Sequence, residues 1–192
     1  QSTLSLWYLH SDSELQQSGD TGGTVPSKQP SQRVGLEWGN YFTPLEQLAF
    51  DLDIADSIAR FKSTDSDDAA PGSPGGKDVP EAVGLVIASG ATLHDWNGFS
   101  TSLRLRYFGP RDLTSDGIFK SNPTVLLNGA ASYQITDTWR IQLELLNIFD
   151  RRDHDIDYAY ESRITPSSAS VFGNVFHPVE PIQFRGGVMA RF

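Results

Sequence analysis

Apolar and polar residues alternate one by one through most of this chain, and this period of two restricts its fold more than any other feature. Residues 139–145 read Trp-Arg-Ile-Gln-Leu-Glu-Leu. In an extended chain, the four apolar side chains fall on one side and the three polar ones on the other. A helix would spread the same charges around its axis. The alternation therefore predicts strands with one apolar face.

The same alternation recurs along the chain and predicts about eight strands. They cover residues 3–12, 33–38, 47–54, 83–94, 102–107, 125–133, 139–145 and 182–192. The connections between them alternate in length: short ones fall at 42–45, 94–97 and 136–138, and long ones at 13–31, 62–81, 109–122 and 150–180. An antiparallel barrel in an outer membrane has short periplasmic turns and long extracellular loops. Both termini would then lie on the short-turn side.

The predicted fold class is all-β: a transmembrane antiparallel up-and-down β-barrel of about eight strands, with residues 1–192 as one domain in a bacterial outer membrane. The chain lacks a run of 18 apolar residues, so no transmembrane helix is expected, whereas a membrane strand needs only about 9–11 residues. Aromatic residues near the strand ends would form the girdles at the two interfaces. These are Trp38, Tyr41, Phe42, Trp96, Phe99, Tyr107, Phe108, Tyr133 and Trp139.

Composition excludes several functions. A formal net charge of -9 argues against a nucleic-acid partner, which would need a basic face to meet phosphate. The chain has no cysteine, which excludes disulfides and thiolate metal sites. No signal peptide opens the chain, so a mature protein or an excised fragment is expected.

Residues 133–151 hold a tightly spaced motif. A strand, a short turn and a second strand end in Asn147, Ile148, Phe149 and Asp150, with a basic residue following. This motif resembles the penultimate hairpin of TonB-dependent receptors, which ends in Asn-(aliphatic)-Phe-Asp-(basic). The family often has a tyrosine soon afterwards, where this chain has Arg-Asp-His.

The last segment, residues 181–192, resembles the last strand of that family. Apolar residues at alternate positions lead to a terminal aromatic, and Phe184, Val188, Ala190 and Phe192 match the pattern. In outer-membrane barrels this pattern is an assembly signal, read through strand addition by the barrel-assembly machinery. The resemblance implies that this machinery and the lipid bilayer are partners.

The resemblance also implies a function. TonB-dependent receptors take up scarce nutrients such as siderophores, vitamins or glycans, and TonB and a nutrient ligand are partners of the intact receptor. The family carries a plug domain, a segment that engages TonB and a barrel of about 22 strands. Residues 1–192 are therefore expected to form the C-terminal strands of such a barrel, without a plug domain and without transport of their own.

The polar face of the predicted strands carries both signs of charge. The candidate lumen residues are Arg33, Glu37, Asp51, Asp53, Arg104, Arg106, Arg140, Glu144, Arg185 and Arg191. In a closed barrel of eight strands these side chains would pair in a narrow lumen, and in a wide receptor barrel they would face water or a plug. The sequence leaves both arrangements open.

No catalytic, cofactor-binding or metal site is expected, and neither is enzyme activity. The acidic segment 153–157 lacks the glycine and glutamate of a calcium loop, because Tyr158 and Ile164 stand at those positions, so we expect a hydrated acidic loop. Tyr158, Tyr160 and Arg163 are weak candidates for ligand contacts.

Two other functions remain open. One is an autonomous eight-stranded outer-membrane barrel with a structural or adhesive role, carried by its long loops. The other is a soluble lipocalin-like barrel that binds a small ligand, in which the apolar faces would point inward.

Overall fold

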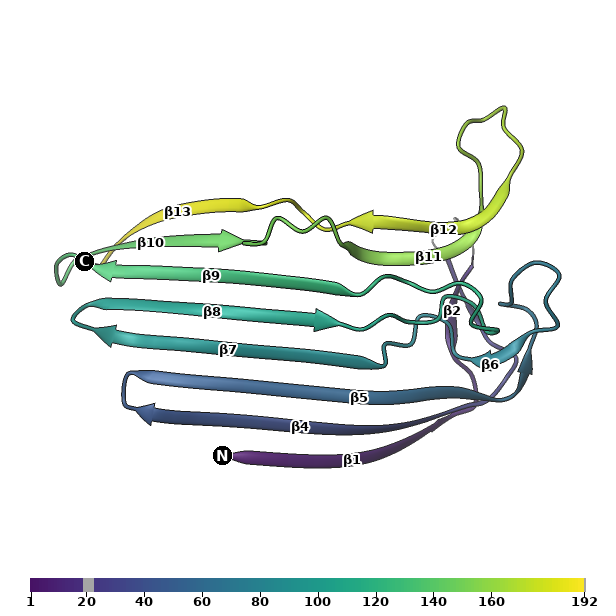
Figure 1. Cartoon of the computed structure of the whole chain (residues 1–192), viewed down its shortest axis with the longest axis horizontal. Helices are drawn as coiled ribbons and strands as arrows, with labels where there is room; N and C mark the ends of the chain where they lie inside the picture. The colour runs from purple at the N-terminus through teal and green to yellow at the C-terminus, as the bar shows by residue number, and fades with distance from the viewer. Residues whose placement is uncertain (19–22, 192) are drawn as a thin grey trace.

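The computed structural model describes residues 1–18 and 23–191, and it is all-β (Figure 1). The strands are β1 (Ser2–Ser11), β2 (Leu15–Ser18), β3 (Gly23–Pro26), β4 (Ser31–Leu45), β5 (Leu48–Asp65), β6 (Gly76–Asp78), β7 (Leu85–Trp96), β8 (Phe99–Phe108), β9 (Thr124–Gln134), β10 (Trp139–Leu146), β11 (His154–Ser162), β12 (Val171–Pro178) and β13 (Gln183–Ala190). In the described residues, no helix is long and apolar enough to span a membrane.

Eight strands form one antiparallel sheet in the order β1-β4-β5-β7-β8-β9-β10-β13, and the short β6 pairs with β5. Each of the eight corresponds to one of the segments predicted from the alternation, in chain order. The prediction of an all-β antiparallel fold is therefore confirmed. Strands β4 and β5 are longer than predicted, because pairing continues up to a turn at residues 46–47 and extends to Asp65 at the other end.

The pairing register separates the side chains into two faces, since residues directly opposite each other share a face. On one face, Leu6 is opposite Leu36, and Ile141 is opposite Val188. Much of this apolar face is exposed, most strongly at the edge strands: 76% of Leu6 and 69% of Val188 are accessible, whereas Ile87 of β7 and Leu127 of β9 are half-buried. A water-soluble sheet would cover such a surface with a second layer, whereas a membrane strand presents it to lipid.

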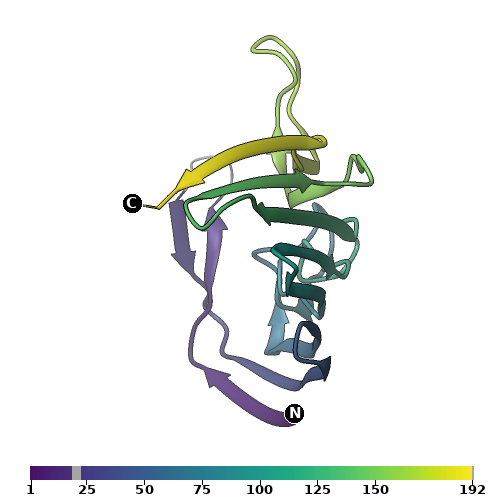
Figure 2. The ribbon, with the colours of Figure 1, turned by 90° about the vertical axis from the view of Figure 1, so that its left-hand side faces the viewer.

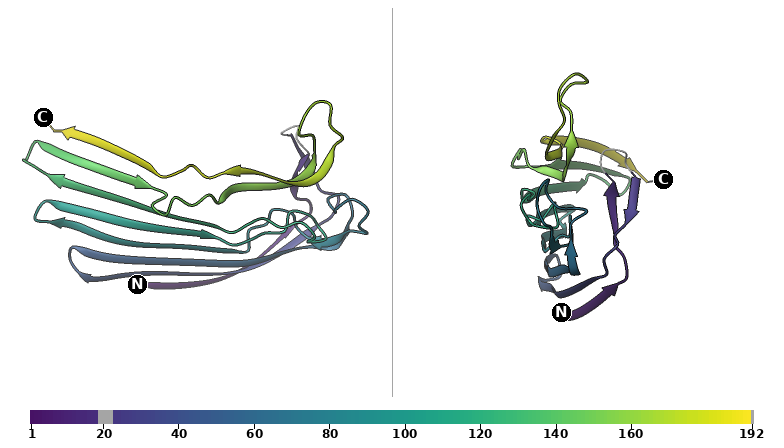
Figure 3. Two further views of the ribbon diagram at one scale, coloured as in Figure 1. Left: turned by 45° about the horizontal axis from the view of Figure 1, so that its top comes forward. Right: turned by 90° about the vertical axis from the view of Figure 1, so that its right-hand side faces the viewer.

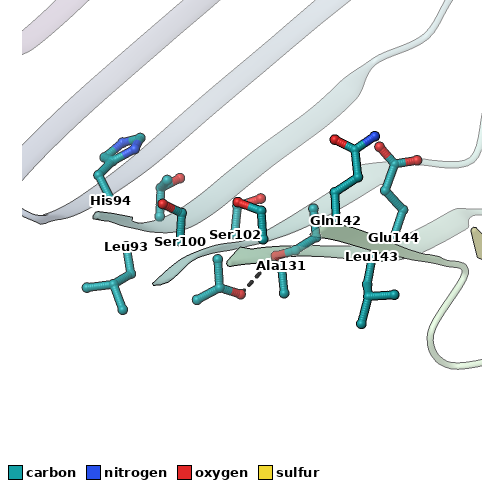
Figure 4. A pocket seen from close by; sticks show the side chains of 12 residues that line it. Leu93, His94, Ser100, Ser102, Ala131, Gln142, Leu143 and Glu144 are labelled. Atoms are coloured by element: carbon teal, nitrogen blue, oxygen red, sulfur yellow. Dashed lines mark hydrogen bonds between the residues drawn. The ribbon is translucent and has the colours of Figure 1, made fainter. Parts of the chain in front are cut away.

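The opposite face is polar. A close view of the neighbouring strands β7, β8, β9 and β10 shows His94, Ser100, Ser102, Gln142 and Glu144 on one side of the sheet (Figure 4). The same view shows Leu93, Ala131 and Leu143 on the other side. Two aromatic residues differ from the prediction. Tyr41 is opposite Asp51 and Phe108 is opposite Val86, so the register places both on the polar face.

The sheet follows an arc when it is viewed along the strands, with β1 and β13 at the two ends (Figure 2). Within the described residues, β1 pairs only with β4, and β13 pairs only with β10. The short turns lie at one end of the strands and the long connections at the other (Figures 1 and 3). The prediction that loop length alternates between the two ends is therefore confirmed.

The long connections contain strands that the alternation did not predict. Residues 13–31 include the hairpin β2–β3, and residues 150–180 include the hairpin β11–β12. The most buried apolar side chains lie mainly among these connections, not under the sheet. Ala70, Val79 and Leu113 in these connections are each at most 7% exposed, and Phe61 is buried at the loop end of β5. The packed core of the described chain is thus at its loop end.

The acidic segment 153–157 is not the hydrated loop that we expected. Asp157 is buried, and its Oδ1 lies 2.5 Å from His154 Nδ1. Asp153 accepts a hydrogen bond from the Val125 N–H at 2.8 Å. Asp153 thus attaches the base of the β11–β12 hairpin to the end of β9, and Asp157 pairs with His154 within β11.

Candidate functional site

The candidate lumen charges lie together on the polar face. Nine of the ten stand in the strands, and the register gives them one common face: Arg33, Glu37, Asp51, Asp53, Arg104, Arg106, Arg140, Glu144 and Arg185. The tenth, Arg191, follows β13 and lines a hollow of about 330 Å³ together with Arg140. Sequence spacing alone grouped these residues, because side chains alternate strictly along a strand.

One ion pair on this face crosses a strand. Nη1 of Arg104 in β8 lies 2.5 and 2.6 Å from the two carboxylate oxygens of Asp51 in β5. The guanidinium reaches Asp51 over Gly90 of the intervening β7, where an added Cβ would collide with Arg104 Nη1. Glycine at this position therefore leaves the space that the ion pair occupies.

The other charges have neighbours of different kinds. Arg33 lies 2.9 Å from Glu14 at the loop end, and Glu37 accepts a hydrogen bond from the Trp7 indole at 3.0 Å. Glu144 and Arg185 are directly opposite in β10 and β13, yet the described residues contain no ion pair between them. The face is thus only partly neutralised within this chain and retains groups able to bind water or a further polar surface.

The motif at Asn147–Asp150 forms a network of hydrogen bonds at the end of β10. The buried Asn147 amide donates to the Arg151 and Glu180 carbonyls, both at 2.9 Å, and its Oδ1 accepts from the Arg151 N–H. Asp150 accepts from the Ile182 N–H at 3.1 Å, just before β13. Asn147 has φ 49°, which asparagine tolerates better than most residues.

The other two motif residues differ in their surroundings. The Ile148 N–H donates to Leu127 of β9 at 2.8 Å, and its side chain packs close to Gly129. Phe149 is 59% exposed. The motif therefore joins three strands at the point where the long connection leaves the sheet.

Strand β13 is an edge strand with an exposed apolar row. Phe184 is opposite Leu145, Val188 is opposite Ile141, and Ala190 is opposite Trp139. Phe184 and Val188 are each 69% exposed. Phe192, the fourth residue of the predicted assembly signal, lies outside the described residues.

A hollow of about 210 Å³ lies among all four long connections. The polar residues that line it include Gln16, Asp67, Asp68, Glu81 and Glu161. Leu15, Pro80, Leu113, Tyr160 and Phe172 line its apolar part. Of the loop residues singled out from the sequence, only Tyr160 belongs to this hollow. The others were missed because four segments far apart in the chain form it together.

Two of the connections are locked together beside this hollow. Ser115 donates its side-chain hydroxyl to the Asp65 carbonyl at 2.6 Å, and its N–H to the Asp68 carbonyl at 2.9 Å. Asp116 accepts hydrogen bonds from the Ala70 N–H at 3.0 Å and the Thr114 hydroxyl at 2.6 Å. Segment 66–84 is therefore held in place by segment 109–123.

The pKa values of the loop carboxylates are shifted in opposite directions. Burial, together with the nearby Asp65 and Asp67, raises the pKa of Asp68 to about 6. Burial also raises the pKa of Glu81, against an opposing effect of Arg111. Burial of Asp116 acts in the same direction, but hydrogen bonds from Ser73, Thr114 and two backbone N–H groups outweigh it and lower its pKa to about 2.

The sequence matches no protein-family model, and a comparison with curated proteins also found no match. Solved structures do resemble it. The ferric-catecholate import receptor Fiu from E. coli K12 aligns with a TM-score of 0.67 at 18% identity, over 100% of this chain and 25% of Fiu. The ferric yersiniabactin uptake receptor FyuA from Yersinia pestis aligns with a TM-score of 0.63 at 16% identity, over 100% of this chain and 28% of FyuA.

The chain has the fold of a TonB-dependent receptor barrel segment. The copper transporter OprC gives the same result, with a TM-score of 0.63 at 16% identity, over 98% of this chain and 30% of OprC. The chain thus spans about 25–30% of the length of these receptors. The resemblance to TonB-dependent receptors seen in the sequence is confirmed at the level of fold, and the similar structures are transport receptors of Gram-negative outer membranes.

Proposed function

We propose that this chain forms part of the wall and outer mouth of a TonB-dependent receptor for nutrient uptake in a bacterial outer membrane. One observation carries the proposal: a single curved sheet has an exposed apolar face, a charged opposite face, and all its long connections at one end. The apolar face contacts lipid, the polar face lines the lumen, and the long connections face outward.

The names of the similar structures support uptake of metals or metal chelates, since they describe ferric-catecholate import, ferric yersiniabactin uptake and copper transport. In this proposal the four-loop hollow contacts the nutrient, and TonB acts on other parts of the intact receptor. In this proposal the chain has no enzymatic role. Residues 1–192 contribute barrel wall and not a plug domain, and they do not transport a nutrient on their own.

The open edges of the sheet fit a wall that continues beyond this chain. Lipid cannot satisfy unpaired backbone N–H and C=O groups, so β1 and β13 each need a further strand. In this proposal, Phe184, Val188, Ala190 and Phe192 act during insertion as the signal for the barrel-assembly machinery. The hydrogen-bond network at Asn147–Asp150 fixes where β13 begins.

Labelling of single cysteines tests the two faces, and the absence of native cysteine makes the experiment clean. Ser102→Cys and Gln142→Cys place a thiol on the polar face, whereas Leu103→Cys and Leu143→Cys place one on the apolar face of the same strands. In lipid vesicles, a charged maleimide should modify the first pair at least about tenfold faster, because hydrocarbon excludes the charged reagent. Equal labelling of both pairs, or faster labelling of the second, contradicts the proposal.

A further inference from the structure

The loop-end hollow carries negative charge that the chain does not balance. Asp67, Asp68, Glu81 and Glu161 line it, and no lysine or arginine of the described residues does. Lys28 pairs with Asp67 at 2.7 Å from outside the lining. The described residues hold no ion pair for Asp68 or Glu161. Glu161 instead accepts a hydrogen bond from the neutral Ser170 hydroxyl, which leaves its charge in place.

The segments around the hollow also carry a net negative charge. Residues 12–18, 23–30, 62–84, 109–123 and 147–182 contain 15 Asp and Glu against 8 Lys and Arg, and Arg33 and Arg60 also pair with Glu14 and Asp78 of these segments. With these two arginines included, 15 acidic residues face 10 basic ones, so the loop end carries -5 of the net -9 of the chain. A concave surface with one sign of charge concentrates ligands of the opposite sign and speeds their association.

The other part of the lining is apolar and aromatic. Phe172 is fixed by Phe119, whose ring lies edge-on to it with centroids 5.2 Å apart. Leu15 and Leu113 line the same hollow. Tyr160 also borders it, but its pairing with Gly173 places its side chain on the face of the hairpin opposite to Phe172. Aromatic faces attract organic cations, and aliphatic neighbours bury the carbon skeleton that carries the charge.

A bare metal ion fits these observations less well. No group of three or more His, Asp or Glu side chains in the described part of the chain is arranged to hold one. An organic cation needs no such coordination shell, since one or two carboxylates and an aromatic face suffice.

We propose that this hollow binds an organic cation, an ammonium group on an apolar or aromatic skeleton. The inference rests on the ligand-capture role given above, and it assigns the hollow a ligand of a different class from the metals and metal chelates that the names of the similar structures describe. Asp68 and Glu161 contact the ammonium group, and Phe172, which is directly opposite Glu161 on the same face of the β11–β12 hairpin, contacts the skeleton.

Three matched compounds test the sign of the charge. Phenethylammonium, 2-phenylethanol and 3-phenylpropionate share one ring and chain length and differ in charge. Their affinities are measured by ligand-observed NMR on the protein in a neutral detergent at pH 7.5. We expect the cation to bind at least about tenfold tighter than the other two, a difference of about 1.4 kcal/mol.

Variants place the binding in the hollow. Asp68→Asn and Glu161→Gln should each weaken binding of the cation several-fold, and Asp155→Asn, an exposed carboxylate outside the lining, should leave it unchanged. Ala159→Trp should abolish binding by filling the hollow. Affinity should also fall between pH 7.5 and pH 5, as Asp68, whose charged neighbours are Asp65 and Asp67, becomes protonated.

Each other result overturns the inference in a distinct way. The alcohol or the carboxylate could bind as tightly as the cation or more tightly, and lose that binding in Ala159→Trp. This result would keep the hollow as a ligand site but reject its preference for a cation. Binding of the cation that survives Ala159→Trp places it elsewhere. No binding of any compound rejects the inference as well, whereas the proposed receptor function fails only if the cysteine labelling of the two faces fails.

Discussion

The guanidinium of Arg104 reaches the carboxylate of Asp51 across an intervening strand, with Nη1 2.5 Å from Oδ1. The path runs over Gly90, and glycine is the only residue type without a Cβ to obstruct it. An ion pair between β5 and β8 thus depends on the residue chosen in β7. This relationship couples three strands through one backbone position.

We therefore expect Gly90→Ala to displace the Arg104 side chain. Arg104→Ala should then lower the free energy of unfolding less in the Gly90→Ala background than in the native chain. Because half of the Arg104 side chain is exposed, the pair itself contributes no more than about 1 kcal/mol. Urea unfolding of the four proteins in detergent measures the coupling as a double-mutant cycle. Ala91→Val, on the apolar side of β7, is the control, and we expect it to leave the free energy of unfolding unchanged. Strictly additive effects would show that Arg104 and Gly90 are independent.

Asn147 should be among the most sensitive positions of the sheet. Asn147→Ala removes three hydrogen bonds from a buried site and leaves the Arg151 and Glu180 groups without these partners. We expect a loss of about 2–4 kcal/mol in the free energy of unfolding. Asn147→Gly tests the backbone, since glycine accepts a φ of 49° but makes no side-chain bonds. If Asn147→Gly is as stable as the native chain, the side-chain bonds contribute nothing.

Asp68 should make segment 66–84 less stable as pH rises. Its pKa is raised from 3.8 to about 6 in the folded chain, so the folded state holds the proton more tightly than the unfolded state does. Its contribution is fully present below about pH 4 and is lost as pH rises through about 6. Hydrogen exchange of segment 66–84, corrected for intrinsic rates, should show less protection at pH 7.5 than at pH 5. Asp68→Asn should remove that difference, and a difference that persists in this variant would exclude Asp68 as its cause.

Asp116 should act in the opposite direction and at lower pH. Its pKa is lowered from 3.8 to about 2, so the ionised form is favoured by folding. Its contribution is present above about pH 4 and is lost as pH falls toward 2. Asp116→Asn should reduce protection of the Ala70 amide at pH 7, because that N–H donates to the Asp116 carboxylate. Unchanged protection at Ala70 would mean that segment 66–84 is held without this carboxylate.

The alternation of residue types determined by itself where the strands of the main sheet lie. In segment 139–145, apolar and polar side chains take opposite sides of a strand at every step, so the pattern specifies both the element and its two faces. Arg104, Glu144 and Arg185 could be assigned to one face for the same reason. The motif at Asn147 was found from its spacing, although nothing in that spacing showed which carbonyls its amide would bind.

Only the tertiary structure decided what joins distant segments. Gly90 reads as an ordinary small residue until the register places it between Asp51 and Arg104. The four-loop hollow is built by residues as far apart in the chain as Gln16 and Phe172, and no local pattern links them. Asp157 looked like a hydrated residue, but its burial follows from packing of the β11–β12 hairpin. A period of two is a local property of the chain, whereas register, burial and the meeting of loops are set by contacts between segments that sequence distance does not encode.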